Sequence, residues 1–449
     1  TGIPARHRRQ PAGIKGLESC ALSRKNVERR RGKCTTLSLF LDGLIAPQDR
    51  QTSLTARIIQ NPLPTHFAAN RLTSNAVGNG AEPKMIIKPY DLEDAVRYHD
   101  GAFPPQVLDY ERLLGPLEDA AASLARYDAK MSGMVNAELF LAPLRRQDAV
   151  TSSRMEGTIS TIEELYRLEA EEDAGSVDPY RNARNDDVET YLYSRALRTA
   201  QEALAEGMPL GEHLIRSAHQ QLLSLGRGAT KSPGSYKVEQ NYIGDERRGK
   251  IYYVPIAPEQ LEPAMAALVQ FINSSGTRPL IRTALAHVEF EALHPFEDGN
   301  GRIGRMLITL MLWRLGVLSQ PNFFVSGYFE THKDEYIERM RAVSAKGDWT
   351  GWVIFFLQAM HEQATVNIQT ADAIFRLHTD MRERFREVLN SQFHDQALDF
   401  VFASPVFRND RFVEKSGIPP TSARLLSRRL VDAGLLRTLQ PAAGRRAAL

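Results

Sequence analysis

The sequence predicts a mainly α-helical protein: a helical core with one β-hairpin, and a small helix-turn-helix domain at the C-terminal end. Three observations carry this prediction. From Met85 onward, apolar residues recur every three or four positions over long stretches. One segment, Tyr236–Pro255, instead has β-branched and aromatic residues on both sides of a polar turn. After Gln392 the long periodic stretches give way to short helical patterns separated by Gly and Pro.

The chain of 449 residues is too long for a single ordinary core, which predicts two or three domains. Its first part, residues 1–84, contains fourteen Lys and Arg against five Asp and Glu, no Met, and both cysteines, Cys20 and Cys34. This segment lacks a sustained apolar period, so we expect it to be disordered or a misassigned upstream extension. A basic targeting peptide or a basic arm is the alternative. The remainder is mildly acidic, without an overall bias toward nucleic acid.

Cysteine usage and hydropathy bear on the compartment. The two cysteines fit neither a disulfide framework nor a zinc site, and the body of the chain from Met85 has none, as a reducing compartment permits. No apolar run approaches the length that a membrane span needs. We therefore expect a cytoplasmic protein with no membrane partner.

Helical periodicity divides the body of the chain into two parts. The N-terminal helical region, residues 85–178, is predicted to hold helices at Val107–Leu124 and Leu139–Tyr166, then an acidic loop at Glu169–Asp178. The central core, residues 179–378, is predicted to begin with a helix at Asp187–Glu206. The further predicted helices are Leu210–Leu225, Pro258–Ile272, Ile281–Leu293, Arg302–Leu315, Lys333–Ala345, Trp349–Arg376 and a separate charged helix at Thr379–Asn390.

A glycine-rich turn stands directly before one of these helices and predicts a polyphosphate site. Gly299, Asn300 and Gly301 permit a backbone on which amide groups converge. The N–H groups and dipole at the start of the following helix favour an anion. Arg302 and Arg305 lie three residues apart on one face of its first turn, where two guanidinium groups can clamp phosphate oxygens.

Two further residues upstream complete a candidate catalytic set. Asp298 offers an oxygen ligand for Mg²⁺ that bridges the phosphates. His294 is a base whose ordinary pKa is close to neutral pH, placed to take a proton from a hydroxyl group. A helix cap alone requires neither the histidine nor paired arginines, so a site for chemistry is the better interpretation.

The string HPFEDGNGRIGR, residues 294–305, resembles the signature of the Fic (filamentation induced by cAMP) family, His-x-Phe-x-Asp/Glu-Gly-Asn-Gly-Arg-x-x-Arg, at every specified position. Members of that family are helical proteins that transfer AMP from ATP to a Ser, Thr or Tyr hydroxyl of a target protein. The resemblance implies a protein adenylyltransferase with ATP as substrate and Mg²⁺ as cofactor. His294 is then the general base, Asp298 the metal ligand, and Gly299 to Arg305 the phosphate site. Gly301 favours AMP transfer, because a lysine there marks the kinase-like branch.

Similarity to the family extends over about Met85 to Ala373. The predicted hairpin looks like the family's flap, which holds a target segment by strand-like pairing; the residues implied are Tyr242, Ile243, Tyr253 and Val254. The family often has Arg where Lys237 stands. The segment Ser152–Gly157, interpreted as part of a helix, fits the family's inhibitory pattern, Ser/Thr-x-x-x-Glu-Gly/Asn. Glu156 would then pair with Arg305 and block the γ-phosphate, with Ser152 beside it.

Two other patterns are interpreted as structural. Gly244–Lys250 matches Gly-x4-Gly-Lys, but Ile251 follows where a P-loop needs Ser or Thr. His287 lies on an apolar helix and is interpreted as a core histidine.

Residues 395–449 resemble a winged helix-turn-helix domain, truncated before its second wing strand. Arg424, Arg428 and Arg429 give its second helix a basic face. DNA and protein partners fit this domain equally well, and a homodimer is also open. Two alternatives to AMP transfer remain: removal of AMP from a modified protein by the same site, and a DNA-binding regulator.

Overall fold

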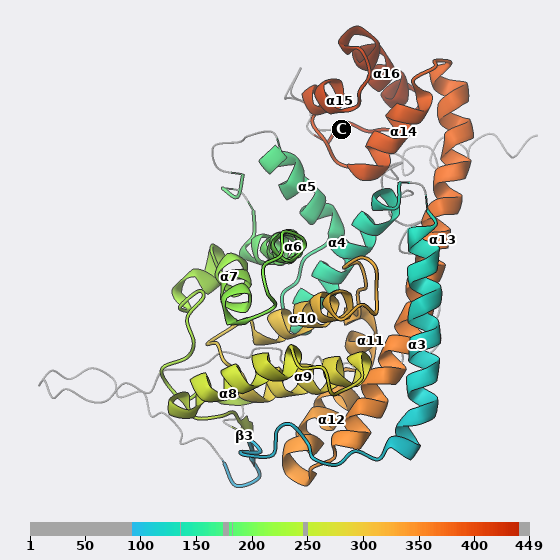
Figure 1. Ribbon diagram of the computed structural model, residues 1–449. Helices are drawn as coiled ribbons and strands as arrows, with labels where there is room; N and C mark the ends of the chain where they lie inside the picture. The colour runs from blue at the N-terminus through green and yellow to red at the C-terminus, as the bar shows by residue number, and fades with distance from the viewer. Residues whose placement is uncertain (1–91, 135, 174–178, 182, 246–249, 440–449) are drawn as a thin grey trace, which may run out of the picture.

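The computed structural model describes residues 92–134, 136–173, 179–181, 183–245 and 250–439, and it is mainly helical, as the sequence predicted (Figure 1). The expectation for residues 1–84 lies outside this range. The longer helices up to the signature are α3 (Tyr110–Ser132), α4 (Glu138–Met155), α5 (Ile162–Asp173), α6 (Asn185–Ala205), α7 (Glu212–Leu222), α8 (Pro258–Ile272) and α9 (Pro279–Leu293). Those that follow are α10 (Asn300–Arg314), α11 (Ser326–Thr331), α12 (Lys333–Lys346), α13 (Trp349–Leu389), α14 (His394–Ala403), α15 (Asn409–Lys415) and α16 (Pro420–Asp432).

Helices α9 and α10 lie at the centre of the molecule, and α13 runs along one side against α3 (Figure 1). Every residue of α9 except Pro279 and Glu291 is buried, as are most residues of α10. A helix that is buried on all faces is held by packing from every side. The loop that joins α9 to α10 therefore starts and ends on rigid elements. No helix in the described ranges is long and apolar enough to cross a membrane.

The C-terminal helices have a hydrophobic cluster of their own. Side chains of α14, α15 and α16 pack around Phe385 and Leu389 at the end of α13, and Phe140 of α4 joins them. Two helices joined by a short turn, α15 and α16, are present in this region, and α16 carries Arg424, Arg428 and Arg429. The predicted wing is not seen: up to Leu439 no strand follows α16. The prediction of a second wing strand lies outside the described residues.

Four predicted boundaries were wrong. The helix expected over Val107–Leu124 runs from Tyr110 to Ser132, because its buried face continues through Tyr127 and Met131. The helix expected over Leu139–Tyr166 ends at Met155, because Gly157 has a left-handed backbone (φ 85°) that stops helical propagation. The loop expected at Glu169–Asp178 begins later, since α5 continues to Asp173. The two helices predicted on either side of residue 378 are one helix, α13, since neither Gly nor Pro interrupts them.

The predicted hairpin is present as β2 (Ile243–Asp245) and β3 (Lys250–Val254), with a third strand that the sequence analysis missed. This strand, β1 (Val96–Arg97), pairs in parallel with β3, so the sheet order is β1-β3-β2. A buried polar network ties β1 to the core: Glu289 of α9 accepts a hydrogen bond from Tyr98 Oη (2.7 Å) and lies 2.8 Å from His99 Nε2. The hairpin is thereby attached to the helix that leads into the signature loop.

His287 is a core residue, as predicted, and it makes stability depend on pH. It is 2% exposed, and its ring nitrogens lie 3.0 Å from the Gly304 carbonyl and 2.8 Å from Tyr336 Oη. Burial lowers its pKa from 6.5 to about 3. The unfolded chain therefore takes up a proton below about pH 6.5 that the folded chain does not. Stability is consequently lost as the pH falls through this window.

We expect the His287→Gln variant to lose less stability than the wild type between pH 7 and pH 5. The expected difference is about 1.4 kcal/mol for each pH unit below the ordinary histidine pKa. Urea unfolding at pH 7, 6 and 5 measures it, and the wild type supplies the reference for all other titrating groups. Parallel pH dependences in the two proteins would contradict this assignment.

Candidate functional site

The signature loop between α9 and α10 is closed by its own side chains. His294 and Gly299 both have a left-handed backbone, with φ of 47° and 81°. The Asn300 carboxamide accepts from Phe296 N (2.9 Å) and donates to Phe296 O (2.8 Å), which closes the turn. Phe296 is fully buried and stacks on His219, with ring centroids 3.7 Å apart. The Asn300 side chain thus braces the loop, and only its main chain is left for the predicted phosphate role.

Two residues before the hairpin hold this loop from outside, and the sequence analysis assigned neither of them a role. Lys237 Nζ donates to Asn241 Oδ1 (2.8 Å) and to the Leu293 carbonyl (3.0 Å). Asn241 Nδ2 donates to the carbonyls of His294 (3.0 Å) and Phe296 (3.1 Å). Burial lowers the pKa of Lys237 to about 7. The segment leading to the hairpin thus fixes the backbone that carries the histidine.

The Asn241→Ala variant is expected to be destabilised by about 1–3 kcal/mol, because Lys237 and two loop carbonyls lose buried partners. The His294 backbone should also lose its fixed position, so activity should fall more than the folded fraction does. Chemical unfolding and activity measured on the same preparation separate the two effects. Gln240→Ala, which changes a neighbouring amide outside the loop brace, is the control. An Asn241→Ala protein with wild-type stability would contradict the proposed brace.

His294 is in the protonation state that a general base needs. Its Nδ1 lies 3.3 Å from the Glu291 carbonyl, which can only accept, so Nδ1 carries the proton and Nε2 has the free lone pair. Burial, together with the charge of Lys237, lowers the pKa of His294 to about 4. The imidazole is therefore neutral at neutral pH and able to take a proton.

Arg305 is buried and is held by the end of α4 through its Nε and Nη2 atoms. Its Nε donates to Ser152 Oγ (2.9 Å), and its Nη2 donates to the Ser152 carbonyl (2.9 Å) and to Glu156 Oε1 (2.7 Å). Burial raises the pKa of Glu156, but the Arg305 charge outweighs it and holds that pKa below its ordinary value. Glu156 is the C-cap of α4, one residue beyond the helix in which the sequence analysis placed it. Gly301 lies against this pair, since a Cβ there would overlap Glu156 Oε1.

A second carboxyl group near Arg305, from Glu291, was also missed. Its Oε1 is buried without a hydrogen-bond partner, and burial raises its pKa to about 8. At neutral pH Glu291 is therefore mostly uncharged, and Glu156 is left to neutralise Arg305. Lys333 Nζ donates to the Met155 carbonyl (2.6 Å) and so secures the end of α4 that carries Glu156.

Arg302, on the first turn of α10, also has hydrogen-bond donors without a partner. Its side chain is 2% exposed; Nη2 donates to Asp298 Oδ1 (3.3 Å), while Nη1 lies 3.7 Å from Glu189 Oε2. Arg302 Nε and Nη1 are buried and have no hydrogen-bond partner. Buried donors of this kind are rare unless a ligand or water uses them. Next to the N-terminus of α10, they fit the oxygens of a phosphate group.

The carboxylate of Asp298 fits a metal ligand that acts together with a nucleotide. Its Oδ1 accepts from Gly299 N and from Arg302, and the side chain is about one-third exposed (37%). No group of three or more metal-binding side chains exists in the part of the chain that the structure describes. Mg²⁺ is commonly held by one or two carboxylates with substrate phosphates and water. A single carboxylate beside a phosphate site therefore fits Mg²⁺ brought in with ATP.

The flap residues are not equivalent. Tyr253 and Val254 lie on the central strand β3, where their backbone already pairs with β1, and both are buried. The Tyr253 hydroxyl donates to the Ala292 carbonyl (3.3 Å). Tyr253 is paired on both sides of β3, with β1 and with Ile243 of β2, whereas Val254 is paired with β1. The contact of these residues with a target stays a prediction. Tyr242 and Ile243, by contrast, are half-buried and belong to the β2 side of the sheet.

Fold and site together define a helical protein with a neutral histidine beside two buried arginines at a helix N-terminus. The Fic/DOC family model matches residues 209–312, and the Fic/DOC family N-terminal model matches residues 114–202. The chain belongs to the Fic/DOC family.

Known relatives are similar over parts of the chain. Protein adenylyltransferase fic-1 of Caenorhabditis briggsae is 34% identical over 95 residues, which are 20% of this chain and 17% of that protein. Protein adenylyltransferase Fic of Drosophila willistoni is 25% identical over 237 residues, 52% of this chain and 44% of that protein. The chain thus spans less than half the length of either relative. A solved Fic family protein from Desulfovibrio desulfuricans is 19% identical, with a TM-score of 0.48 over 77% of this chain and 97% of that one.

Proposed function

We propose that this protein transfers AMP from ATP to a hydroxyl group of a target protein. The observation that carries the proposal is the buried Arg302 guanidinium, next to a neutral His294 and the N-terminus of α10. Its Nε and Nη1 make no hydrogen bond, although Nη1 lies 3.7 Å from Glu189. Phosphates and a base are the two requirements of this reaction. The relatives named above are protein adenylyltransferases, which supports the same activity.

In the proposed reaction, His294 Nε2 takes the proton of the target hydroxyl as its oxygen attacks the α-phosphorus of ATP. A new O–P bond forms, the bond to the bridging oxygen between the α- and β-phosphorus breaks, and pyrophosphate leaves. Arg302 and Arg305 hold the charge that accumulates on the leaving phosphates. Mg²⁺ held by Asp298 would add charge neutralisation at the phosphates.

We further propose that Glu156 inhibits the protein. Its carboxylate accepts a hydrogen bond from Arg305 Nη2, which a γ-phosphate would otherwise bind. A carboxylate and a phosphate oxygen cannot use that nitrogen together, and their charges repel. In this proposal the state with the Glu156–Arg305 contact is the inhibited one, and its activity is expected to be low.

We place the target segment beside β2, where an extended peptide could add to the hairpin by main-chain pairing. Such pairing orders the peptide without reading its sequence, so a hydroxyl can be presented to His294 from a range of residues. Ile243 and Tyr242 are the side chains on this strand and just before it.

The test is label transfer from ATP with Mg²⁺ to the protein itself and to a lysate. Label from α-³²P-ATP but not from γ-³²P-ATP is the expected result, because AMP retains only the α-phosphorus. Label from γ-³²P-ATP alone would instead identify phosphoryl transfer. If no label transfers from either nucleotide to any acceptor, even without Glu156, the proposal fails.

A further inference from the structure

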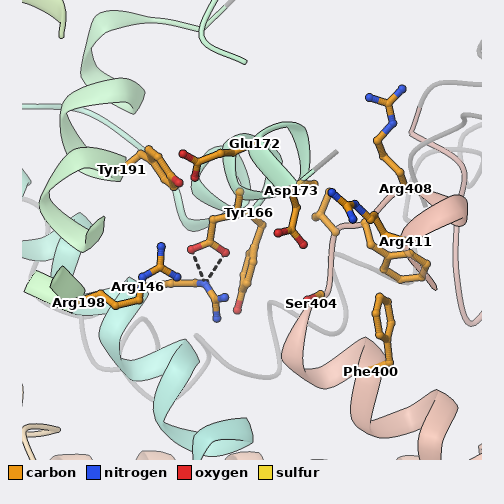
Figure 2. Close-up of a pocket in the computed structure, with 14 residues that line it drawn as sticks. Arg146, Tyr166, Glu172, Asp173, Tyr191, Arg198, Phe400, Ser404, Arg408 and Arg411 are labelled. Atoms are coloured by element: carbon orange, nitrogen blue, oxygen red, sulfur yellow. Dashed lines mark hydrogen bonds and ion pairs between the residues drawn. The ribbon is translucent and has the colours of Figure 1, made fainter. Parts of the chain in front are cut away.

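A cavity of about 170 Å³ lies away from the signature loop, where α4, α5 and α6 meet the C-terminal helices (Figure 2). Arg146 of α4, Tyr166 of α5 and Arg198 of α6 line it on the catalytic side. Arg408 and Arg411 line it on the C-terminal side. The cavity is thus built from both hydrophobic clusters, and the proposed reaction uses none of these residues.

Its acidic lining residues are already matched by cations. Glu169 receives two hydrogen bonds from Arg146 Nε (3.0 and 2.8 Å), the contact drawn dashed in Figure 2. Glu172 pairs with Arg195 (3.2 Å) and Asp173 pairs with Lys415 (3.0 Å). These carboxylates therefore leave little negative charge for a cationic ligand.

The basic and hydroxyl groups, in contrast, include buried hydrogen-bond donors without a partner. Arg146 Nη1, Arg408 Nε and the Tyr166 hydroxyl are buried without a hydrogen-bond partner. Tyr166 is 1% exposed, and its ring lies under the Arg146 guanidinium, 4.6 Å from the ring centroid. Arg198 is exposed and has no ion pair within the described ranges. Arg408 pairs with Glu171 (3.4 Å) and Arg411 with Glu414 (3.1 Å), so the charge without a counterion at this cavity is that of Arg198. Together with the unused buried donors, this charge favours an acceptor with negative charge.

We propose that this cavity binds a small phosphate-bearing anion, which links the C-terminal helices to α4 and α5. Its volume is close to that of a protein cavity that holds a benzene-sized molecule, so an inorganic phosphate or a small phosphate ester fits. Arginine forks match the tetrahedral oxygens of phosphate. Because α4 also carries Ser152 and ends at Glu156, the bound anion contacts the helix that engages Arg305.

Two substitutions test the site without removing an existing partner. Tyr166→Phe deletes only the unpartnered hydroxyl, so the free protein should keep its stability, while its affinity for phosphate should fall about 3- to 10-fold. Arg198→Gln removes an exposed charge and should weaken phosphate binding about tenfold or more. Tyr110→Phe and Arg112→Gln, both at exposed positions of α3, are the matched controls.

The probe is inorganic phosphate, titrated at constant ionic strength and followed by the saturable rise in Tm. All variants are made in an Arg302→Gln background, which weakens the anion site at the signature. The readout is binding, so the result is independent of AMP transfer. Saturable stabilisation that both cavity variants weaken and both controls retain is the expected result. Unchanged affinity in both cavity variants, no saturable binding, or tighter binding of malonate than of phosphate would overturn the proposal.

Discussion

Replacing Glu156 with glycine is expected to raise AMP transfer about 10- to 100-fold. A hydrogen bond between charged groups contributes about 1.5–3 kcal/mol, and this is the free energy that ATP must overcome to reach Arg305. The side chain of Arg305 is 2% exposed and that of Glu156 22%, so solvent weakens this pair only in part. Initial rates of transfer from α-³²P-ATP measure the change.

The same variant should be less stable, which makes the result distinctive. Removing one partner of a buried ion pair leaves Arg305 uncompensated, because Glu291 is largely uncharged at neutral pH. ATP with Mg²⁺ should then restore stability more strongly in this variant than in the wild type. Glu156→Gln is the matched control: it keeps a group of equal size near Arg305 and should give a smaller activation. A folded Glu156→Gly protein with no gain in rate would disprove the inhibitory role.

Replacing His294 with alanine is expected to lower AMP transfer by about 10²- to 10⁴-fold, the usual contribution of a positioned general base. The loss should appear in the presence and the absence of Glu156, since the histidine and the phosphate contacts serve different steps. Single-turnover transfer is best measured in the Glu156→Gly background, because its higher expected rate makes a large loss of activity easier to detect.

Stability should separate His294 from the other histidine of the same helix. His294 makes one long contact through its ring, to the Glu291 carbonyl, so His294→Ala should fold almost as well as the wild type. His287 is a core residue, and His287→Gln should change the pH dependence of stability while retaining transfer by the folded fraction. If His294→Ala retained more than about a tenth of the activity, the base would have to be another group.

Features with local causes could be predicted from the sequence. The bounds of α8 were correct, since Pro258 starts the helix and the apolar spacing runs to Ile272. The signature loop was recognised because its base, glycines and arginines are neighbours in sequence. The contact between Glu156 and Arg305 was expected only through a family resemblance, because nothing local indicates that α4 packs against α10.

Features that depend on tertiary contacts were missed. Lys237 and Asn241 have no periodic pattern, and their roles come from carbonyls more than fifty residues away in sequence. The two-residue strand β1 is too short to give an alternating signal, and it exists because β3 offers an edge. The cavity beside Tyr166 needs three helices and the C-terminal helices to be placed together. In each case the residues lie in one segment of the chain, and the partners that give them a role lie in another segment that is distant in sequence.

The contact between Gly301 and Glu156 also links changes at these two positions. A Cβ at position 301 would overlap the Glu156 carboxylate, so any side chain there must shift the flexible end of Glu156 or move α10. The loss of Glu156, by contrast, creates no overlap. On the proposed role of Glu156, a side chain at position 301 would therefore weaken the inhibition even in a protein that retains the glutamate.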